Sequence, residues 1–363
     1  MSLRRLVKRS IALTCLYYLV DDRRARWRLA RGRLATRSGT RHATLSLDDS
    51  LDYIDRVYAD YLAYGGLQRF SGRVAEIGPG DNFGIALRML GAGAREVHTV
   101  DRYRPLRDDA RQARIHRALA ERHGLGGLLD GGAGGSEIRG LVAHEGVPAE
   151  SFFRSSGLRF DCIVSRAVLE HLYDPLAALD GMAAALAPGG TMIHRIDFRD
   201  HGMFAGHHPL TFLTVPDAPY RAMTRASGRP NRLLLPAWRD WLERSPLAGS
   251  LRITRLVGVE GELGPAAWDD IDPEARRTAL GMVQTIRPHL TPHLAAFADQ
   301  DLAVSGCVLV AGQPARHTGA DETSRADGRS TAKGPEQREP CGSGSMNGSG
   351  SRPFDIHART TRA

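Results

Sequence analysis

The sequence predicts an α/β protein: a seven-stranded, mostly parallel sheet flanked by helices, with a basic helical arm before it and a disordered tail after it. Two observations predict the sheet. From Arg73 onward, short apolar runs alternate with segments of helical periodicity, which is typical of parallel strands joined by helices. The stretch "EIGPGDNFG", which begins at Glu76, also places three glycines directly after the first apolar run and before a helix.

A helix is expected ahead of the first strand. The stretch "LDDSLDYIDRVYADYLAYGGL" lies between a Ser/Asp cluster, which favours a helix start, and Gly65-Gly66, which favours a helix end. Its apolar residues recur at helical spacing, at Leu51, Ile54, Val57, Tyr58, Tyr61 and Leu62. The first half of the sheet then follows as strand 74–77, helix 83–90, strand 96–100 and helix 107–123.

The second half of the sheet is expected at strands 138–143, 160–164, 191–196, 251–259 and 302–310, with a mostly helical insertion at about 261–300. These elements define one domain over 43–312. The glycine-rich stretch "GLGGLLDGGAGGSE" follows a helix and not a strand, so it predicts a flexible loop and not a phosphate-binding turn. Small and polar residues dominate 313–363, which is therefore predicted to be disordered.

The net charge of +8 is concentrated at the N-terminus. Residues 1–42 contain twelve Arg or Lys and two Asp, or +10, which leaves about −2 for the remaining residues. A near-neutral body argues against a nucleic-acid partner, because nucleic-acid binding needs a basic face on the fold. The arm's apolar run, Ile11 to Val20, is about half of what a membrane span requires, and no cleavage site follows it.

Two interpretations of this arm remain open. A basic amphipathic helix can lie on an anionic membrane surface, which here would be the inner face. Alternatively, the helix packs on the body and exposes a solvated arginine face. The four cysteines, Cys15, Cys162, Cys307 and Cys341, form no paired motif, so a reducing, cytoplasmic compartment and no structural metal are expected.

The glycine turn has the features of a cofactor site. Gly78 and Gly80 leave the backbone bare after a strand, so a ligand can approach the amides closely. Asp101 ends the next strand about 20 residues later, where an acid can bind ribose hydroxyls. Glu76 stands two residues before the first glycine. An acid there suits a ligand with an ammonium and a sulfonium group and would repel a pyrophosphate.

This arrangement resembles the Rossmann-like (class I) S-adenosylmethionine-dependent methyltransferases. A second block, "FDCIVSRAVLEHLYDPLAALDGMAAALAPGGTMI", begins at Phe160 and is similar to that family's fourth strand, the helix after it with its "LEH" turn, and the Pro-Gly-Gly turn into the fifth strand. The resemblance covers about Leu62 to Asp200. It implies S-adenosylmethionine as the cofactor.

The resemblance also implies roles for particular residues. Those implied to line the methionine half of the cofactor are Glu76, Gly78, Pro79 and Gly80. Asp101 is implied to bind the ribose, and Glu150 is a candidate for the adenine amino group, with a solvated acid at a helix end as the alternative. Ser165 and Arg166 are implied to line the far side of the cofactor.

Acceptor-binding residues are expected in "HRIDFRDHGMFAGHHPLTFL", which follows the fifth strand, because ligands of such folds bind beyond the carboxyl ends of the strands. We predict Asp197 and His201 as the catalytic residues, with His201 as a base, since histidine side chains exchange protons near neutral pH. Polar packing of this His- and Asp-rich loop is one alternative, and a divalent metal is another, although no metal ligand is assigned.

The function predicted from these features is S-adenosylmethionine-dependent methylation, at oxygen, of a small-molecule or glycan-like acceptor. A nicotinamide-dependent oxidoreductase is the alternative from another enzyme class. Glu76 disfavours it, as does the lack of a Tyr-x-x-x-Lys motif: Lys8 is the only lysine before residue 312. A non-catalytic cofactor-binding module is a third interpretation.

Overall fold

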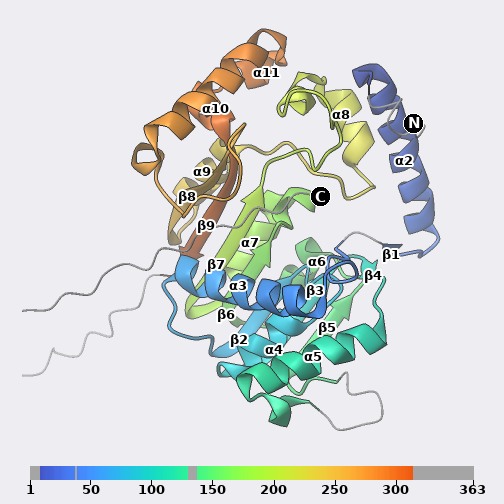
Figure 1. Ribbon diagram of the computed structural model, residues 1–363, viewed down its shortest axis with the longest axis vertical. Helices are drawn as coiled ribbons and strands as arrows, with labels where there is room; N and C mark the ends of the chain where they lie inside the picture. The colour runs from blue at the N-terminus through green and yellow to red at the C-terminus, as the bar shows by residue number, and fades with distance from the viewer. Residues whose placement is uncertain (1–8, 37–38, 130–136, 314–363) are drawn as a thin grey trace, which may run out of the picture. The chain divides into compact units, whose positions relative to one another are not determined.

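The computed structural model describes residues 9–36, 39–129 and 137–313 (Figure 1). The predicted disorder at 314–363 and the centre of the glycine-rich loop lie outside the described residues. The described part contains a seven-stranded sheet with the order β5-β3-β2-β6-β7-β9-β8. Neighbouring strands are parallel except at β9, which runs antiparallel to both β7 and β8. The predicted α/β fold is therefore confirmed.

The strands and helices of the parallel half follow the predicted order closely. The strands are β2 (Gly72–Ile77), β3 (Ala94–Asp101), β5 (Leu141–Glu145), β6 (Phe160–Arg166) and β7 (Leu186–Asp197). The helices are α3 (Leu47–Gly65), α4 (Gly84–Gly91), α5 (Asp109–His123), α6 (Ala149–Ser155) and α7 (Pro175–Ala185). Ser46 caps the start of α3 by accepting a hydrogen bond from the Asp49 N–H, and Gly66 ends it with φ +61°.

Each face of the sheet has its own apolar core. Helices α3, α4 and α5 pack on the face that carries Val74 and Val164, while α6 and α7 pack on the face that carries Ala75 and Ile163 (Figure 1). Because successive side chains of a strand point to opposite faces, a strand covered on both sides must be apolar throughout. That is why the central strands read as continuous apolar runs in the sequence.

Several predicted strand positions differ from the structure. Strand β7 begins at Leu186, and not at 191, so the residues of the predicted Pro-Gly-Gly turn belong to the strand. Three other differences have a local reason. Strand β5 begins at Leu141, and not at 138, because Gly140 takes φ +84° in a turn. Strand β8 (Ala248–Leu256) ends before a turn at Gly258, which has φ +73°. Strand β9 (Val304–Gly312) starts later than predicted because the short helix α12 (Asp299–Ala303) comes first.

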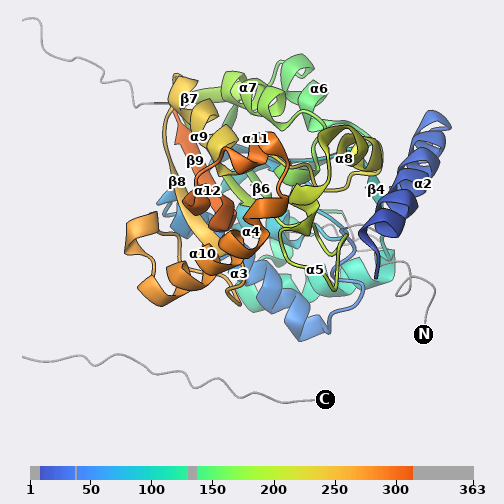
Figure 2. The ribbon, with the colours of Figure 1, turned by 90° about the horizontal axis from the view of Figure 1, so that it is seen from above.

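Further helices lie beyond the carboxyl end of β7. The connection from β7 to β8 carries α8 (Asp217–Thr224) and α9 (Leu235–Arg244). The connection from β8 to β9 carries α10 (Pro273–Ile286), α11 (Pro292–Ala295) and α12 (Figure 2). A two-stranded sheet joins β1 (Ala35–Thr36) to β4 (Arg104–Pro105), directly after β3.

The arm forms helix α2 (Ile11–Ala30), which packs against α8 (Figures 1 and 2). Its contact face includes Tyr18 and Asp22, both buried. The Asp22 carboxylate accepts hydrogen bonds from the backbone N–H groups of Ala226 at 2.6 Å and Ser227 at 2.8 Å. Of the two interpretations of the arm, the structure therefore shows a helix docked on the body. No helix within the described ranges is long and apolar enough to cross a membrane.

Candidate active site

Polar side chains collect where the parallel strands end. Strand β2 ends at Ile77 beside Ser165 of β6, and Asp101 at the end of β3 lies opposite Glu145 at the end of β5. Strand β7 ends at Asp197. Carboxyl ends of parallel strands meet at one edge of a sheet, which is where ligands of open α/β sheets bind. This edge is the candidate active site.

The glycine turn after β2 is bare because no side chain fits there. Gly78 and Gly80 have φ +69° and +72°, a region that side chains disfavour. A Cβ atom at Gly80 would lie 2.7 Å from the Gly39 carbonyl oxygen. Asp81 holds the segment around Gly39 against the turn. Its N–H donates a hydrogen bond to Gly39 O at 3.0 Å, and its carboxylate accepts one from the Ala43 N–H at 2.9 Å. The last residues of the predicted arm are thus tied to the turn.

Glu76 is a buried acid without a partner. Its side chain is on β2, only 2% of the residue's surface is exposed, and Oε2 makes no hydrogen bond. Burial raises the pKa of Glu76 to about 8, since a carboxylate removed from water is destabilised. A cationic group placed next to it would restore the charged form.

Asp101 and Glu145 form the next part of the edge. The Asp101 carboxylate accepts a hydrogen bond from the Tyr103 N–H at 2.8 Å, and burial raises its pKa to about 6. Glu145 forms an ion pair with Arg107, whose guanidinium also donates to Gly80 O at 2.9 Å. Arg107 therefore links the glycine turn to the end of β5.

The other predicted cofactor residues are held by different partners. Glu150 starts α6, and its Oε1 accepts a hydrogen bond from the Tyr173 N–H at 3.0 Å. The Ser165 hydroxyl is 2.8 Å from Nδ1 of the fully buried His194, whose pKa burial lowers to about 3. Arg166 pairs with Asp60 at 2.6 Å, on α3. Glu76, Asp101 and the Gly78-Pro79-Gly80 turn thus lie at one edge of the sheet. The side chains of Glu150, Ser165 and Arg166 contact other parts of the fold.

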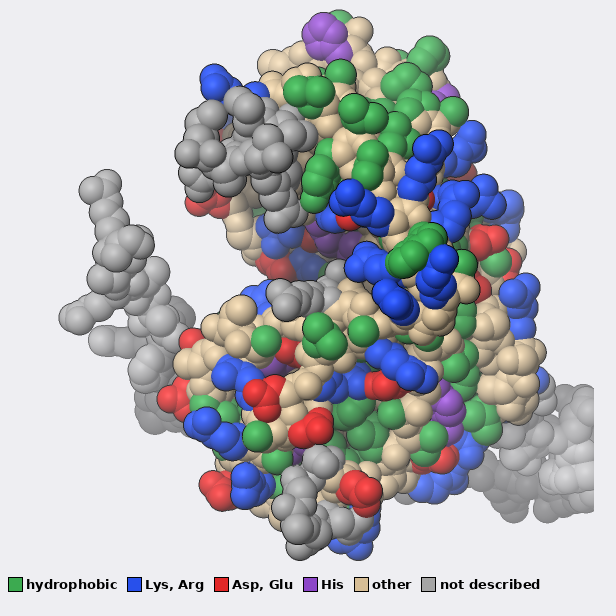
Figure 3. Space-filling view, turned by 90° about the vertical axis from the view of Figure 1, so that its right-hand side faces the viewer, with side chains coloured by type: hydrophobic (Ala, Val, Ile, Leu, Met, Phe, Trp, Pro, Cys, Tyr) green, Lys and Arg blue, Asp and Glu red, His purple; other side chains and the backbone are tan. Residues whose placement is uncertain are grey.

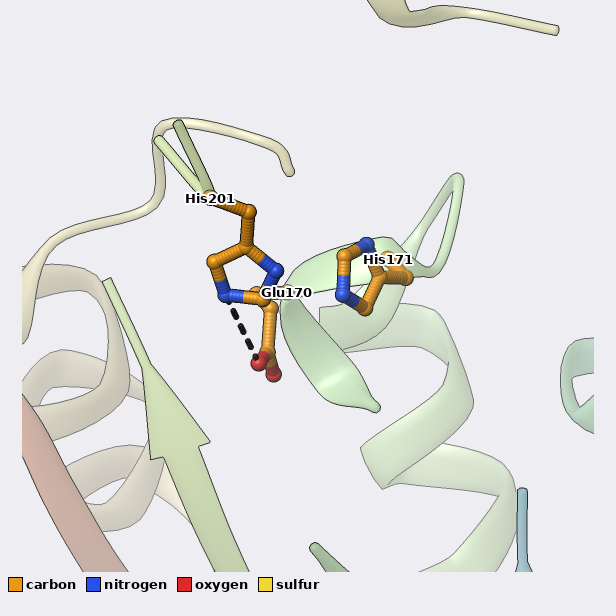
Figure 4. Close-up of side chains that lie close together, drawn as sticks. All are labelled: Glu170, His171 and His201. Carbon is orange, nitrogen blue, oxygen red and sulfur yellow. Dashed lines mark ion pairs between the residues drawn. The ribbon is translucent and has the colours of Figure 1, made fainter. Parts of the chain in front are cut away.

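The acceptor-side residues form a second group, after β7. Although burial alone would raise the pKa of Asp197, the Arg199 guanidinium, with Nε at 2.8 Å, holds that pKa well below its usual range. His201 has φ +50°, and its Nε2 lies 3.7 Å from both Asp197 Oδ2 and Glu170 Oε1 (Figure 4). Asp197 and His201, the two residues predicted to be catalytic, thus lie close together. They line a hollow with Arg199, Asp200 and Gly202.

Glu170 and His171 complete this group and were not predicted as site residues. They lie on the turn after β6, within "LEH". Glu170 is 1% exposed, and burial together with the Asp197 charge raises its pKa well above the usual range. The His171 ring is 4.8 Å from the His201 ring, and burial lowers its pKa to about 4. The sequence signal was the acid-histidine pair directly after an apolar strand.

A model of the methyltransferase domain matches residues 51–252, which include both strand-end groups. The chain belongs to the S-adenosylmethionine-dependent methyltransferase family. S-adenosylmethionine is the cofactor of this family, as the sequence predicts. No curated protein matches the chain.

Solved methyltransferase structures resemble this chain at low identity. One is phosphoethanolamine N-methyltransferase 2 of Haemonchus contortus, with 14% sequence identity and a TM-score of 0.38. The match covers 71% of the present chain and 52%, or about half, of the Haemonchus contortus protein. A methyltransferase of Bacillus halodurans, described as putative, is 13% identical over 71% of this chain and 98% of its own (TM-score 0.37). N-methyltransferase NodS of Bradyrhizobium japonicum is 13% identical over 74% of this chain and 87% of its own (TM-score 0.34).

Proposed function

We propose that this methyltransferase transfers the methyl group of S-adenosylmethionine to a hydroxyl oxygen of a small-molecule or glycan-like acceptor. One observation carries the proposal. Two groups lie along a single sheet edge. Glu76, with a buried Oε2 that has no partner, adjoins the glycine turn, and His201, after β7, lies near the carboxyl groups of Asp197 and Glu170. The first group suits the cofactor and the second suits a proton-bearing acceptor.

The residues at the glycine turn fit the cofactor's charges. The ammonium of its methionine end would give Glu76 Oε2, which adjoins the glycine turn, the partner that it lacks. The side-chain positions at Gly78 and Gly80 are filled by Val168 and by the Gly39 carbonyl oxygen, so glycine is required there by the fold itself. Asp101 would accept hydrogen bonds from the ribose hydroxyls. The same buried acid would repel the pyrophosphate of a nicotinamide cofactor, which supports the methyltransferase over the oxidoreductase interpretation.

We assign the adenine amino group to Glu145 and not to Glu150. Glu145 ends the strand next to Asp101 and lies opposite it in the register, so it can reach the end of a ligand whose ribose Asp101 holds. Glu150 is on a helix and caps the chain at Tyr173. Its Oε1 is therefore engaged within the fold, while its Oε2 is buried without a hydrogen-bond partner. Glu145 is paired with Arg107, so the assignment rests on its position opposite Asp101.

His201 is placed to take a proton from the acceptor. The acceptor oxygen attacks the methyl carbon, the carbon–sulfur bond breaks, and its electron pair stays on sulfur to give S-adenosylhomocysteine. The hydroxyl proton passes to the His201 imidazole, whose Nε2 lies 3.7 Å from both Asp197 Oδ2 and Glu170 Oε1. A neutral amine acceptor needs no such base, so this group favours oxygen.

Labelled methyl transfer tests this proposal. The full-length protein is incubated with methyl-labelled S-adenosylmethionine and a panel of methyl glycosides and phenols, each with its amino and deoxy counterpart. We expect label on at least one hydroxyl compound and none on its deoxy counterpart. Transfer to amines alone would contradict the oxygen assignment.

We also propose that α2 contacts an anionic membrane surface, with no nucleic acid as a partner. Of the eight exposed large hydrophobic residues in the described ranges, six lie on α2: Ile11, Leu13, Leu16, Tyr17, Val20 and Trp27. Arginines at 23, 24 and 28 lie on the same helix, and Figure 3 shows apolar and basic side chains side by side on the face that α2 covers. Apolar side chains beside arginines suit anionic headgroups.

Vesicle sedimentation tests this surface. A triple variant, Leu13→Ser, Leu16→Ser and Val20→Ser, should lose most of its binding to vesicles of about 30% anionic lipid at low salt, because burial of these side chains drives insertion. The matched control is Leu106→Ser with Val142→Ser, the two exposed hydrophobic residues outside α2. Equal sedimentation of both variants would overturn the membrane contact.

A further inference from the structure

We propose that Glu170, His171 and His201 bind a divalent transition-metal cation. The three residues come from the turn after β6 and the loop after β7, two neighbouring strands. One potential ligand atom from each lies within 4.8 Å of the others, and the side chains converge (Figure 4). Within the described ranges, they form the one group of three His, Cys, Asp or Glu residues that could hold an ion.

The state of Glu170 is independent support for an ion here. The residue is 1% exposed, and neither carboxylate oxygen has a hydrogen-bond partner of good geometry. The nearby backbone N–H groups of Glu170 and Asp197 offset the effect of burial on its pKa only in part. His201 Nε2 lies 3.7 Å from Glu170 Oε1, beyond hydrogen-bond distance. A buried carboxylate without partners is costly, and a cation at this position would satisfy both of its oxygens.

His171 is oriented as metal-binding histidines usually are. Its Nδ1 donates a hydrogen bond to the Gly228 carbonyl oxygen at 2.9 Å, so Nε2 keeps its lone pair for a ligand. That backbone contact also fixes the ring plane. The Asp197 carboxylate, 3.7 Å from His201 Nε2, lies just outside the three residues and adds negative charge.

The donor set indicates the class of cation. Two imidazoles and one carboxylate suit zinc and the other late first-row ions better than magnesium or calcium, which prefer oxygen alone. In a tetrahedral zinc site, neighbouring ligand atoms are about 3.4 Å apart. The three ligand atoms here are further apart than that, so they must move together when the ion binds. His201 has room to move, since its side chain is 30% exposed and lies on a loop.

Three protein ligands leave coordination positions open, as in catalytic sites. This step rests on the proposed function: an acceptor hydroxyl that binds the cation loses its proton to solvent more readily, and its oxygen is held for attack on the methyl carbon. Acceptors with two adjacent oxygens would then be preferred. With the cation bound, His201 is a ligand and the proton passes to solvent; the imidazole accepts the proton only in the metal-free site.

Zinc titration of the metal-free, untagged full-length protein tests the site, without cofactor or acceptor. We expect one equivalent of Zn²⁺ to bind, with affinity at least about 100-fold weaker in His201→Ala and in Glu170→Gln. His289→Ala removes an exposed histidine outside the group and should bind as the wild type does. Thermal melting of each variant checks that it is folded. His201→Ala is the safer variant, because its side chain is the most exposed of the three.

Absence of stoichiometric binding by the wild type, or equal binding by folded His201→Ala, would overturn this inference. Titration of the same samples with S-adenosylhomocysteine separates the two proposals. Cofactor binding without Zn²⁺ binding refutes the metal site alone. Zn²⁺ binding without cofactor binding refutes the proposed function and leaves the metal site supported.

Discussion

His201→Ala is expected to lower turnover by about 100-fold or more while its affinity for S-adenosylhomocysteine stays within about twofold of the wild type. The residues proposed to hold the cofactor lie at the ends of β2, β3 and β5, whereas His201 follows β7. Loss of the imidazole removes the group next to the acceptor hydroxyl, whether it acts as a base or as a metal ligand. Single-turnover methyl transfer and calorimetry measure the two effects separately.

The matched control for this variant is His208→Asn. His208 lies on the same connection, but it accepts a hydrogen bond from the Leu210 N–H and faces Thr285, away from the site. Asparagine can keep the bond to Leu210, so turnover should not change. Normal turnover in His201→Ala would remove this residue from the mechanism.

Glu76→Gln is expected to weaken S-adenosylhomocysteine binding by about 10- to 100-fold and to stabilise the free protein at pH 8. The amide cannot balance the ligand's ammonium, and a hydrogen bond to a charged group contributes about 1.5 to 3 kcal/mol. The effect on stability has the opposite sign because the wild-type carboxylate is buried without a partner.

The pH dependence of stability follows from the raised pKa of Glu76. That pKa is about 8 in the fold, against 4.5 for an ordinary glutamate, so the folded protein binds this proton more tightly than the unfolded chain does. The stability that the protonated acid contributes is complete below about pH 4.5 and is lost as the pH rises to 8. Glu76→Gln removes this loss, which amounts to roughly 2 to 4 kcal/mol at pH 8.

Denaturant unfolding at pH 5 and pH 8 measures this difference. The exposed Glu121→Gln is the control and should follow the wild type. A Glu76→Gln variant that loses stability at pH 8 would show that the carboxylate already has a partner in the free protein. The proposal that Glu76 is free to bind the ammonium of the ligand would then be wrong.

Local sequence patterns were sufficient to predict the glycine turn after β2. Strand β2, the glycines after it and Asp101 at the end of β3 are consecutive features, and each depends on contacts within a few residues. Glu145, which we propose for the adenine amino group, was not among the predicted residues because the strand was placed too early. Nothing local shows that Gly140 turns the chain and moves the strand end from 143 to 145. Once the register is known, Glu145 stands directly opposite Asp101.

Partners that lie far apart in the sequence could not be predicted. The contact between the Ser165 hydroxyl and His194, across two neighbouring strands, was not predicted. Glu170 and His171 were recognised only as part of a family motif. Their approach to His201 depends on the register of β6 and β7 and on the unusual backbone angle of His201. Side-chain pairs between separate loops are a property of the folded chain.

The most direct test of the central claim, that this sheet edge binds S-adenosylmethionine, is calorimetric titration of the wild type with S-adenosylhomocysteine and, in parallel, with NAD and NADP. The account predicts one site for S-adenosylhomocysteine, weakened in Asp101→Ala by about 10- to 100-fold as ribose hydrogen bonds are lost, and no heat with either dinucleotide. Binding of NAD or NADP without binding of S-adenosylhomocysteine would contradict it.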